Sequence, residues 1–238
     1  MGNDARKLVA DGYPLEQVVT SDLRQGVCTL FLHWLQKRKN TPPFFCFRHW
    51  AEFADLGHKL FRTTQETYPI AFIPGDILDP KHLEVVPPLE SAAHGGSKPG
   101  DPPSVQAPDL RSLTSLNPLH GRVFAIHASC FFHLFDEEKQ LHVARAFAGL
   151  LSKERGSVIF GLQRGSAEKG LSQSAVLGNH RAFCHSPESW NELWDGLVFE
   201  KGVVKVQAKL VEMGKKYLEV DGPQSTSFTM LVWSVTRL

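Results

Sequence analysis

"GRVFAIHASCFFHLFDEEKQLHVARAFAGLLSKERGSVIFGLQ", residues 121–163, reads as a strand, a helix and a second strand. The outer segments, 121–129 and 156–163, are short runs rich in apolar and β-branched residues, as in buried strands. Between them, Asp136 precedes two glutamates and an apolar stripe with helical spacing, so Asp136 is expected to cap the helix. Two strands joined by a helix predict a crossover between parallel strands.

The same alternation extends in both directions along the chain. Strands are predicted at 16–22 and 68–76, and helices at 52–63 and 186–199, the last with Ser186 and Pro187 at its start. The tail holds two long strands, 202–213 and 227–238, which are expected to pair as an antiparallel hairpin at one edge of the sheet. The sequence therefore predicts one α/β domain spanning 1–238, with a largely parallel sheet and a C-terminal antiparallel hairpin.

Composition limits the classes of partner. The 238 residues are 42% hydrophobic and carry 26 basic and 25 acidic side chains, a formal charge of +1. The near-zero net charge gives no strong positive electrostatic field to attract nucleic acid or an anionic membrane, so a small molecule is the expected partner. The oligomeric state is left open. Residues 87–118 are rich in Pro, Gly, Ser and Ala, which predicts a flexible surface loop.

Cysteine and histidine spacing gives no metal pattern. The four cysteines form no CxxC pair, and the chain has no signal peptide or membrane-spanning apolar run, which predicts a cytoplasmic setting with reduced, mostly buried thiols. The histidines lack a compact set of cysteine or carboxylate partners, so no metal site is expected. The histidines considered are His127, His133, His142, His180 and His185.

Two predicted strands end in an aspartate, Asp22 and Asp76. In an open parallel sheet, ligands bind beyond the carboxyl ends of the strands. A carboxylate at Asp22 can accept hydrogen bonds from both ribose hydroxyls, and one at Asp76 can accept from an adenine amino group while Ile77 covers the ring. Either aspartate alone is equally typical of a turn or cap. Together they predict a cofactor that contains adenosine.

At this point the sequence resembles a fungal group of class I S-adenosylmethionine-dependent methyltransferases, related to those of meroterpenoid and other secondary-metabolite clusters. The resemblance covers nearly the whole chain except Gly26–Ala51 and the loop after Pro87. It implies a Rossmann-like sheet of seven strands flanked by helices, and a small-metabolite substrate. It also implies S-adenosyl-L-methionine as cofactor, with Asp22 and Leu23 at the ribose and Asp76 and Ile77 at the adenine. The segments that carry it are "RKLVADG", "SDLR", "DLGHKLFR", "GDILDP", "GRVFAIHASCFFHLFDEEKQLHVARAFAGLLS", "GSVIFG", "FCHSPESW" and "LVWSVTRL".

His127 and Ala128 stand at the end of the strand 121–129, where class I methyltransferases commonly place cofactor and substrate contacts. A histidine there can remove a proton from a hydroxyl, because its ordinary pKa of about 6.5 suits a base near neutrality. A structural histidine bonded to the backbone is the alternative, and both remain open. Packing in the core is the favoured interpretation of the neighbouring Phe131, Phe132 and Phe135, and a role as walls of an apolar substrate pocket is the alternative.

Two departures from the family pattern are expected to matter. The family begins upstream with a strand that runs into a glycine-rich turn, and Met1-Gly2-Asn3-Asp4 stands where that turn should end. Gly2 is then its only trace, so the first, central strand is expected to be missing and the chain to have little or no activity.

The second departure is Gly26–Ala51, an apparent insertion between "SDLR" and the helix 52–63. Its composition and possible codon boundaries suggest a translated intron. As a functional insert, its basic run Lys37–Lys39 and its aromatic residues would instead form a lid or a partner-binding element.

Three functions follow from these patterns. The first is an S-adenosylmethionine-dependent methyltransferase of small fungal metabolites. The second is a non-catalytic remnant of such an enzyme. The third, an NAD-dependent oxidoreductase, shares the ribose-binding carboxylate but is disfavoured because no GxGxxG turn is present.

Overall fold

The computed structural model describes residues 3–14, 17–22, 58–64, 66–89, 109–173, 181–213 and 228–238. The chain divides into two compact units. One comprises Met1–Leu83 with Pro102–Pro118, and the other Glu84–Asp101 with Leu119–Leu238. The expectation of one domain over 1–238 stays a prediction.

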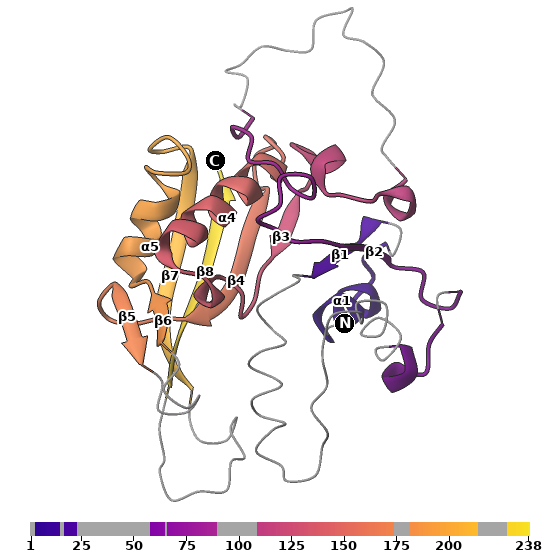
Figure 1. The fold of residues 1–238 in the computed structure, drawn as a ribbon, viewed down its shortest axis with the longest axis horizontal. Helices are drawn as coiled ribbons and strands as arrows, with labels where there is room; N and C mark the ends of the chain where they lie inside the picture. Colours follow the sequence, from indigo (N-terminus) through magenta and orange to yellow (C-terminus); the bar gives the residue numbers. More distant parts are fainter. Residues whose placement is uncertain are drawn as a thin grey trace, which may run out of the picture. The chain divides into compact units, whose positions relative to one another are not determined.

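The larger unit is built on a four-stranded mixed sheet (Figure 1). Its strands are β3 (Ala125–His127), β4 (Val158–Arg164), β7 (Val204–Met213) and β8 (Phe228–Arg237), in the order β3-β4-β8-β7. β3 and β4 are parallel, as a helical crossover requires, whereas β8 is antiparallel to both β4 and β7. The predicted C-terminal hairpin is therefore confirmed, with β7 at the edge.

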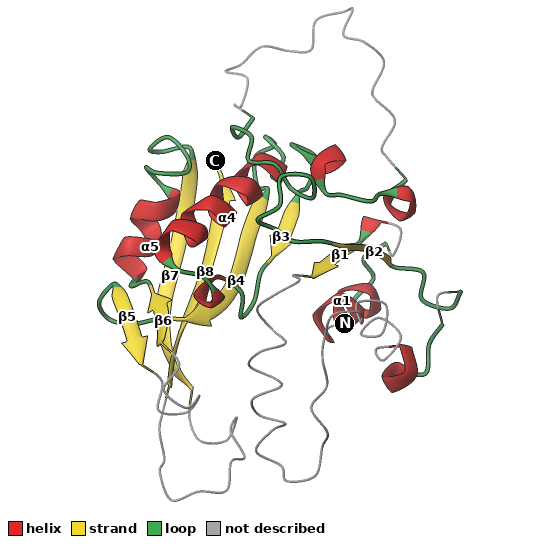
Figure 2. Ribbon diagram, in the orientation of Figure 1, coloured by secondary structure: helices red, strands yellow, loops and turns green. Residues whose placement is uncertain are grey.

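Alternation along β4 and β8 separates a buried face from an open one. On β4, Ile159 is fully buried while the next residue, Phe160, is 40% exposed; on β8, Trp233 is 3% exposed beside Val232 at 37%. Helices α4 (Glu137–Leu150) and α5 (Pro187–Trp194) both lie across the buried face (Figures 1 and 2). The core of this unit thus lies between these helices and one side of the sheet.

Four aromatic side chains form the centre of that core. Phe132, in a 3-10 turn before α4, is fully buried, and its ring centroid is 5.0 Å from that of Trp190 and 5.7 Å from that of Trp233. Trp190 and Trp233 are 4.9 Å apart, and Trp194 is 5.8 Å from Trp190. Rings at these separations and steep angles gain quadrupole attraction beyond burial alone, so this cluster joins α5 to β8.

Both helices begin as the sequence predicts. The Asp136 carboxylate accepts a hydrogen bond from the Lys139 amide at 2.9 Å, and Ser186 and Ser189 form a reciprocal capping box at the start of α5. α5 ends at Trp194, earlier than predicted, because Gly196 has φ 145° and the chain turns there.

A second hairpin was not predicted. β5 (Gly170–Gln173) and β6 (Arg181–Cys184) pair in antiparallel register, with Gly170 opposite Cys184. Lys169, just before β5, forms a 2.5 Å ion pair with Glu137 of α4. Both strands are four residues long, too short to show a clear period of two in the sequence.

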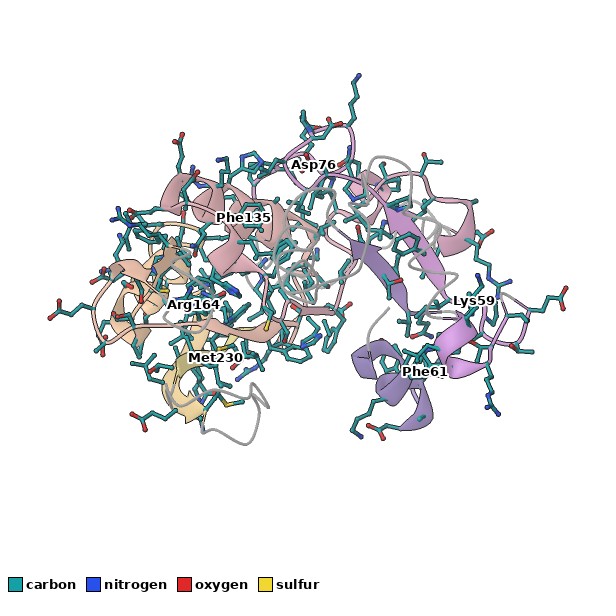
Figure 3. The ribbon with its side chains drawn as sticks, turned by 60° about the horizontal axis from the view of Figure 1, so that its bottom comes forward. Lys59, Phe61, Asp76, Phe135, Arg164 and Met230 are labelled. Atoms are coloured by element: carbon teal, nitrogen blue, oxygen red, sulfur yellow. The ribbon has the colours of Figure 1, made fainter. Side chains whose placement is uncertain are left out.

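The smaller unit contains α1 (Asn3–Ala10) and a parallel pair, β1 (Val19–Asp22) and β2 (Ala71–Pro74). The Arg6 guanidinium of α1 lies 4.3 Å from the ring centroids of both Phe61 and Tyr68, and it donates to the Thr63 hydroxyl at 3.0 Å. Figure 3 labels Phe61 in the helical turn 58–61, which this arginine joins to α1. Only that last turn of the predicted helix 52–63 lies within the described residues.

These observations support a mixed α/β fold with a sheet that is partly parallel and partly antiparallel. The described strands fall into three groups, β1-β2, β3-β4-β8-β7 and β5-β6. A continuous seven-stranded sheet remains a prediction. Among the helices that the structure describes, none is both long and apolar enough to cross a membrane.

Candidate functional site

The carboxyl ends of β1 and β2 lie at the same edge of their two-stranded sheet. The strands are parallel and in register, with Ser21 opposite Ile73 and Asp22 opposite Pro74. Gly75 and Asp76 follow directly, so the backbone brings Asp22 and the turn that holds Asp76 to one strand-end region. This is the arrangement from which the sequence predicted a nucleoside site.

Asp76 organises the turn after β2, where it is labelled in Figure 3. Its Oδ1 atom accepts a hydrogen bond from the Leu78 amide at 3.0 Å, and its own carbonyl accepts from the Asp79 amide at 3.0 Å. The side chain thus has the turn-forming role that a lone aspartate often has. A carboxylate has about four acceptor positions, so one such bond leaves capacity for a ligand.

Ile77 is part of the core of the smaller unit, only 5% exposed. An adenine amino group needs an acceptor, and Asp76, half-buried at the surface, supplies one. The adenine assignment therefore rests on Asp76 more than on the side chain of Ile77.

His82 lies against this turn and was not identified from the sequence. Its side chain is 5% exposed, and its Nε2 atom is 3.2 Å from the Ser21 hydroxyl of β1. A Cβ atom on Gly75 would be 2.0 Å from Nδ1 of the ring, so the imidazole occupies space that only glycine leaves open. Burial lowers the pKa of His82 from its ordinary value, and the Asp79 and Asp76 carboxylates offset part of that effect.

The larger unit contains a cavity of about 1070 Å³. It is lined by His127 and Ser129 at the end of β3, by Phe160 of β4 and by Val232 of β8, and α5 contributes Glu188 and Asn191. His127 is exposed, its Nε2 atom is 2.7 Å from the Ser129 hydroxyl, and its ring centroid is 5.0 Å from that of Phe160. Such a histidine can exchange a proton with a molecule in the cavity.

Ala128, the neighbour of His127, is 6% exposed and has a structural role. Its amide donates to the Phe160 carbonyl at 2.9 Å, which extends the pairing of β3 with β4 by one residue. This backbone hydrogen bond therefore supports the strand end that carries His127.

The three phenylalanines after β3 pack within the larger unit. Phe131 is 5.8 Å from Phe147 in a stacked arrangement, 5.8 Å from Phe132 and 5.4 Å from Phe135. None of the three lines the cavity. The core-packing interpretation is the one that the geometry supports.

Several predicted residues lie outside the described part of the chain. These are Gly2, Leu23 and the segment Gly26–Ala51, together with Cys28 and Cys46. Of the remaining cysteines, Cys184 is 1% exposed, as expected for a small buried hydrophobe, whereas Cys130 is exposed. Within the described ranges, no group of three or more His, Cys, Asp and Glu side chains is arranged to hold a metal ion.

Comparison with curated proteins identifies relatives along most of the chain. The O-methyltransferase phiE of Fungal sp. (strain ATCC 74256) is 25% identical over 224 residues, 93% of this chain and 55% of the relative. The O-methyltransferase atr3 of Stereocaulon alpinum is 25% identical over 91% of this chain and 46% of its own length. The Asnovolin E/Chermesin D methyltransferase nvfJ of Aspergillus novofumigatus is 26% identical over 84% of this chain and 51% of its own.

The chain spans about half the length of these relatives. No protein-family model matches it. The matches nevertheless extend across both compact units, because the first covers 93% of the chain. The resemblance predicted from the sequence is thereby confirmed: over most of its length this chain is similar to fungal methyltransferases.

Proposed function

We propose that this chain is an S-adenosyl-L-methionine-dependent methyltransferase of the class I fold that acts on a small fungal metabolite. The observation that carries the proposal is the register of β1 and β2, which aligns Asp22 with Pro74 and so brings Asp22 and the Asp76 turn to one sheet edge. The names of the relatives support a methyl transfer, and the β7–β8 hairpin supports the class I fold.

The strand ends fit the nucleoside half of such a cofactor. Charged carboxylates accept hydrogen bonds from vicinal hydroxyls and amino groups more strongly than neutral acceptors do. Asp22 is assigned to the ribose, Asp76 to the adenine amino group, and Gly2 and Leu23 remain assigned to the cofactor by the family resemblance alone. When bound, S-adenosyl-L-methionine supplies an electrophilic methyl group, so the protein needs chiefly to align the acceptor and exclude water.

His127 is proposed to take the proton from a metabolite hydroxyl. It lines the cavity of the larger unit beside Phe160, which offers an apolar wall for a ring or alkyl portion of a substrate. The Ser129 hydroxyl, 2.7 Å from Nε2, orients the imidazole. An imidazole oriented in this way can act as the general base, and the hydrogen bond from the Ala128 amide to the Phe160 carbonyl keeps the strand end in place.

Calorimetric titration with S-adenosylhomocysteine tests the cofactor assignment. Asp22→Ala and Asp76→Asn should each weaken binding by about 1 to 3 kcal/mol, the cost of a lost charge-assisted hydrogen bond. Asp79→Asn is the matched control, because Asp79 belongs to the same turn and its Oδ1 caps the Lys81 amide at 2.9 Å. Binding of NAD in place of S-adenosylhomocysteine would point to the oxidoreductase, and binding of neither to a non-catalytic remnant.

The base assignment has a separate test. His127→Gln should lower the rate of radiolabelled methyl transfer to a fungal extract by roughly 10²-fold or more while leaving S-adenosylhomocysteine affinity unchanged. Asn191→Ala, which alters the same cavity at α5, serves as the comparison. Equal rates in His127→Gln and the unmodified chain, both well above the background without protein, would remove His127 from the chemistry.

A further inference from the structure

His82 is a buried histidine of the smaller unit that contacts both the end of β1 and the turn after β2. His82 is the second-last residue of the turn region 75–83 and comes after the adenine-side carboxylate, whereas Ser21 lies in β1 next to the ribose-side carboxylate. The 3.2 Å contact between Ser21 Oγ and His82 Nε2 is therefore a direct side-chain link between the two halves of the proposed nucleoside site.

His82 is held through both its backbone and its ring. Its backbone amide donates to the Asp79 carbonyl at 2.8 Å, and its carbonyl accepts from the Leu116 amide at 2.8 Å. The ring edge carrying Nδ1 lies so close to Gly75 that a Cβ atom there would be 2.0 Å away. With its backbone fixed at both ends and its ring fixed against Gly75, His82 has little freedom to give up its contact with Ser21.

We infer that His82 is a positioning residue of the cofactor site, which sets the spacing between the end of β1 and the Asp76 turn through its contacts with Ser21 and Gly75. The inference rests on the proposed function. It goes beyond that function because it assigns the alignment of the two carboxylates to a residue that contacts neither ribose nor adenine.

The protonation state of His82 should then control cofactor affinity. The charged groups that act on it are Asp79 and Asp76, both in the turn after β2; β1 contributes the Ser21 hydroxyl, and segment 109–118 the Leu116 amide. Burial keeps the ring neutral near pH 7, because the lowered pKa moves protonation to more acidic conditions. A proton gained at acidic pH creates a cation that attracts the Asp79 and Asp76 carboxylates and so alters the position of the Asp76 turn relative to β1.

Two substitutions separate positioning from stability. His82→Leu fills the space without a hydrogen-bonding group, whereas the amide nitrogen of His82→Gln can replace Nε2 opposite Ser21. Leu83→Ala is the matched control, because Leu83 is fully buried beside His82 and its truncation weakens the same core without touching Ser21. Circular dichroism at each pH selects conditions under which every variant is folded.

Calorimetric titration with S-adenosylhomocysteine gives the readout at pH 7.5 and at the most acidic pH at which every variant is folded, because burial moves the pKa of His82 below its ordinary value. At pH 7.5, His82→Leu should bind roughly tenfold more weakly, while His82→Gln and Leu83→Ala should bind nearly as the unmodified chain does. At the acidic pH the unmodified chain should lose affinity and His82→Gln should not. This pattern would support the inference, since a purely structural histidine gives no rescue by glutamine and no difference in pH dependence.

The contrary results are distinct. If the unmodified chain binds S-adenosylhomocysteine and His82→Leu binds equally well, or if His82→Gln loses affinity with acid as the unmodified chain does, the positioning role is wrong and the proposed function stands. If the unmodified chain does not bind at pH 7.5, the proposed function fails and this inference fails with it.

Discussion

The carbonyl oxygen of Ala128 lies directly over Gly161, so that a Cβ atom at residue 161 would be 2.1 Å from it. The Ala128 amide at the same time donates to the carbonyl of Phe160, the residue before Gly161. The end of β3 thus packs on the backbone of β4 at a distance that no side chain allows. The position of His127 in the cavity depends on this close approach.

Gly161→Ala should therefore destabilise the larger unit. The added methyl group overlaps backbone atoms, which must shift, and overpacking of this kind costs about 1 to 3 kcal/mol. Urea denaturation followed by tryptophan fluorescence measures the change. Glu212→Ala, at an exposed position of β7, is the control and should change the free energy of unfolding by about 0.5 kcal/mol or less.

Phe132→Ala should be more damaging. The fully buried ring contacts Trp190 and Trp233, and removing a large core aromatic costs about 3 to 5 kcal/mol. Phe124→Ala removes the same ring from a position that is 48% exposed and should cost far less. Similar losses for the two variants, measured by the same denaturation, would contradict the central role assigned to Phe132.

The larger unit should lose stability in acid through His185. Its side chain is 2% exposed, its Nδ1 atom is 2.9 Å from the Ser189 hydroxyl, and burial lowers its pKa to about 4. The pKa of His185 in the folded chain lies below the ordinary 6.5 that applies to the unfolded chain. The free energy of unfolding therefore has the full contribution of the neutral His185 above pH 6.5 and loses it as the pH falls toward 4. Between pH 7 and pH 5 this amounts to about 2 kcal/mol.

His185→Gln removes the titrating group, so the free energy of unfolding should fall less steeply over this pH range than in the unmodified chain. Asn191→Ala, at an exposed position of α5 with no titrating group, should leave the slope unchanged. His133, whose pKa burial also lowers to about 4, contributes a comparable slope that both variants retain. Parallel curves for the unmodified chain and His185→Gln would refute the assignment.

Thiol labelling should distinguish the two cysteines of the larger unit. Cys130 is exposed, whereas Cys184 is 1% exposed and burial raises the pKa of its thiol, which leaves less of the reactive thiolate. In a chain carrying Cys28→Ser and Cys46→Ser, one equivalent of a thiol reagent should react under native conditions and a second only after denaturation. Rapid native reaction of both, resolved by mass spectrometry of peptides, would be inconsistent with the burial of Cys184.

The sequence predicts best where a local signal and the tertiary structure agree. Asp136 caps α4 because its carboxylate and the following glutamates favour a helix start regardless of what packs on it. The long tail strands are recognisable because ten residues give a sustained alternation, and they pair as predicted. The candidate carboxylates follow from the same logic, since parallel strands must end at one edge.

Other features depend on contacts that no local pattern records. The segments "GLSQ" and "RAFC" have no strand period of their own, but β5 and β6 pair with each other and are anchored to α4 by the Lys169–Glu137 ion pair and by the Gln140 amide, which donates to the Phe183 carbonyl. His82 is similar: a histidine after a proline-containing turn has no sequence signal for burial, and its contacts with Ser21 and Gly75 exist only in the folded unit. Such long-range pairings are set by packing rather than by propensity.

The strand order of the larger unit constrains how the chain can fold as it is synthesised. β7 is made before β8, yet β8 lies between β7 and β4, so β7 has no partner in this sheet until β8 has left the ribosome. Trp190 of α5 likewise cannot make its ring contact with Trp233 until β8 has been made. The nascent chain therefore keeps β7 and the tryptophan-bearing face of α5 without their β8 contacts until residues 228–237 have been made, so the sheet of the larger unit closes only after β8 is available.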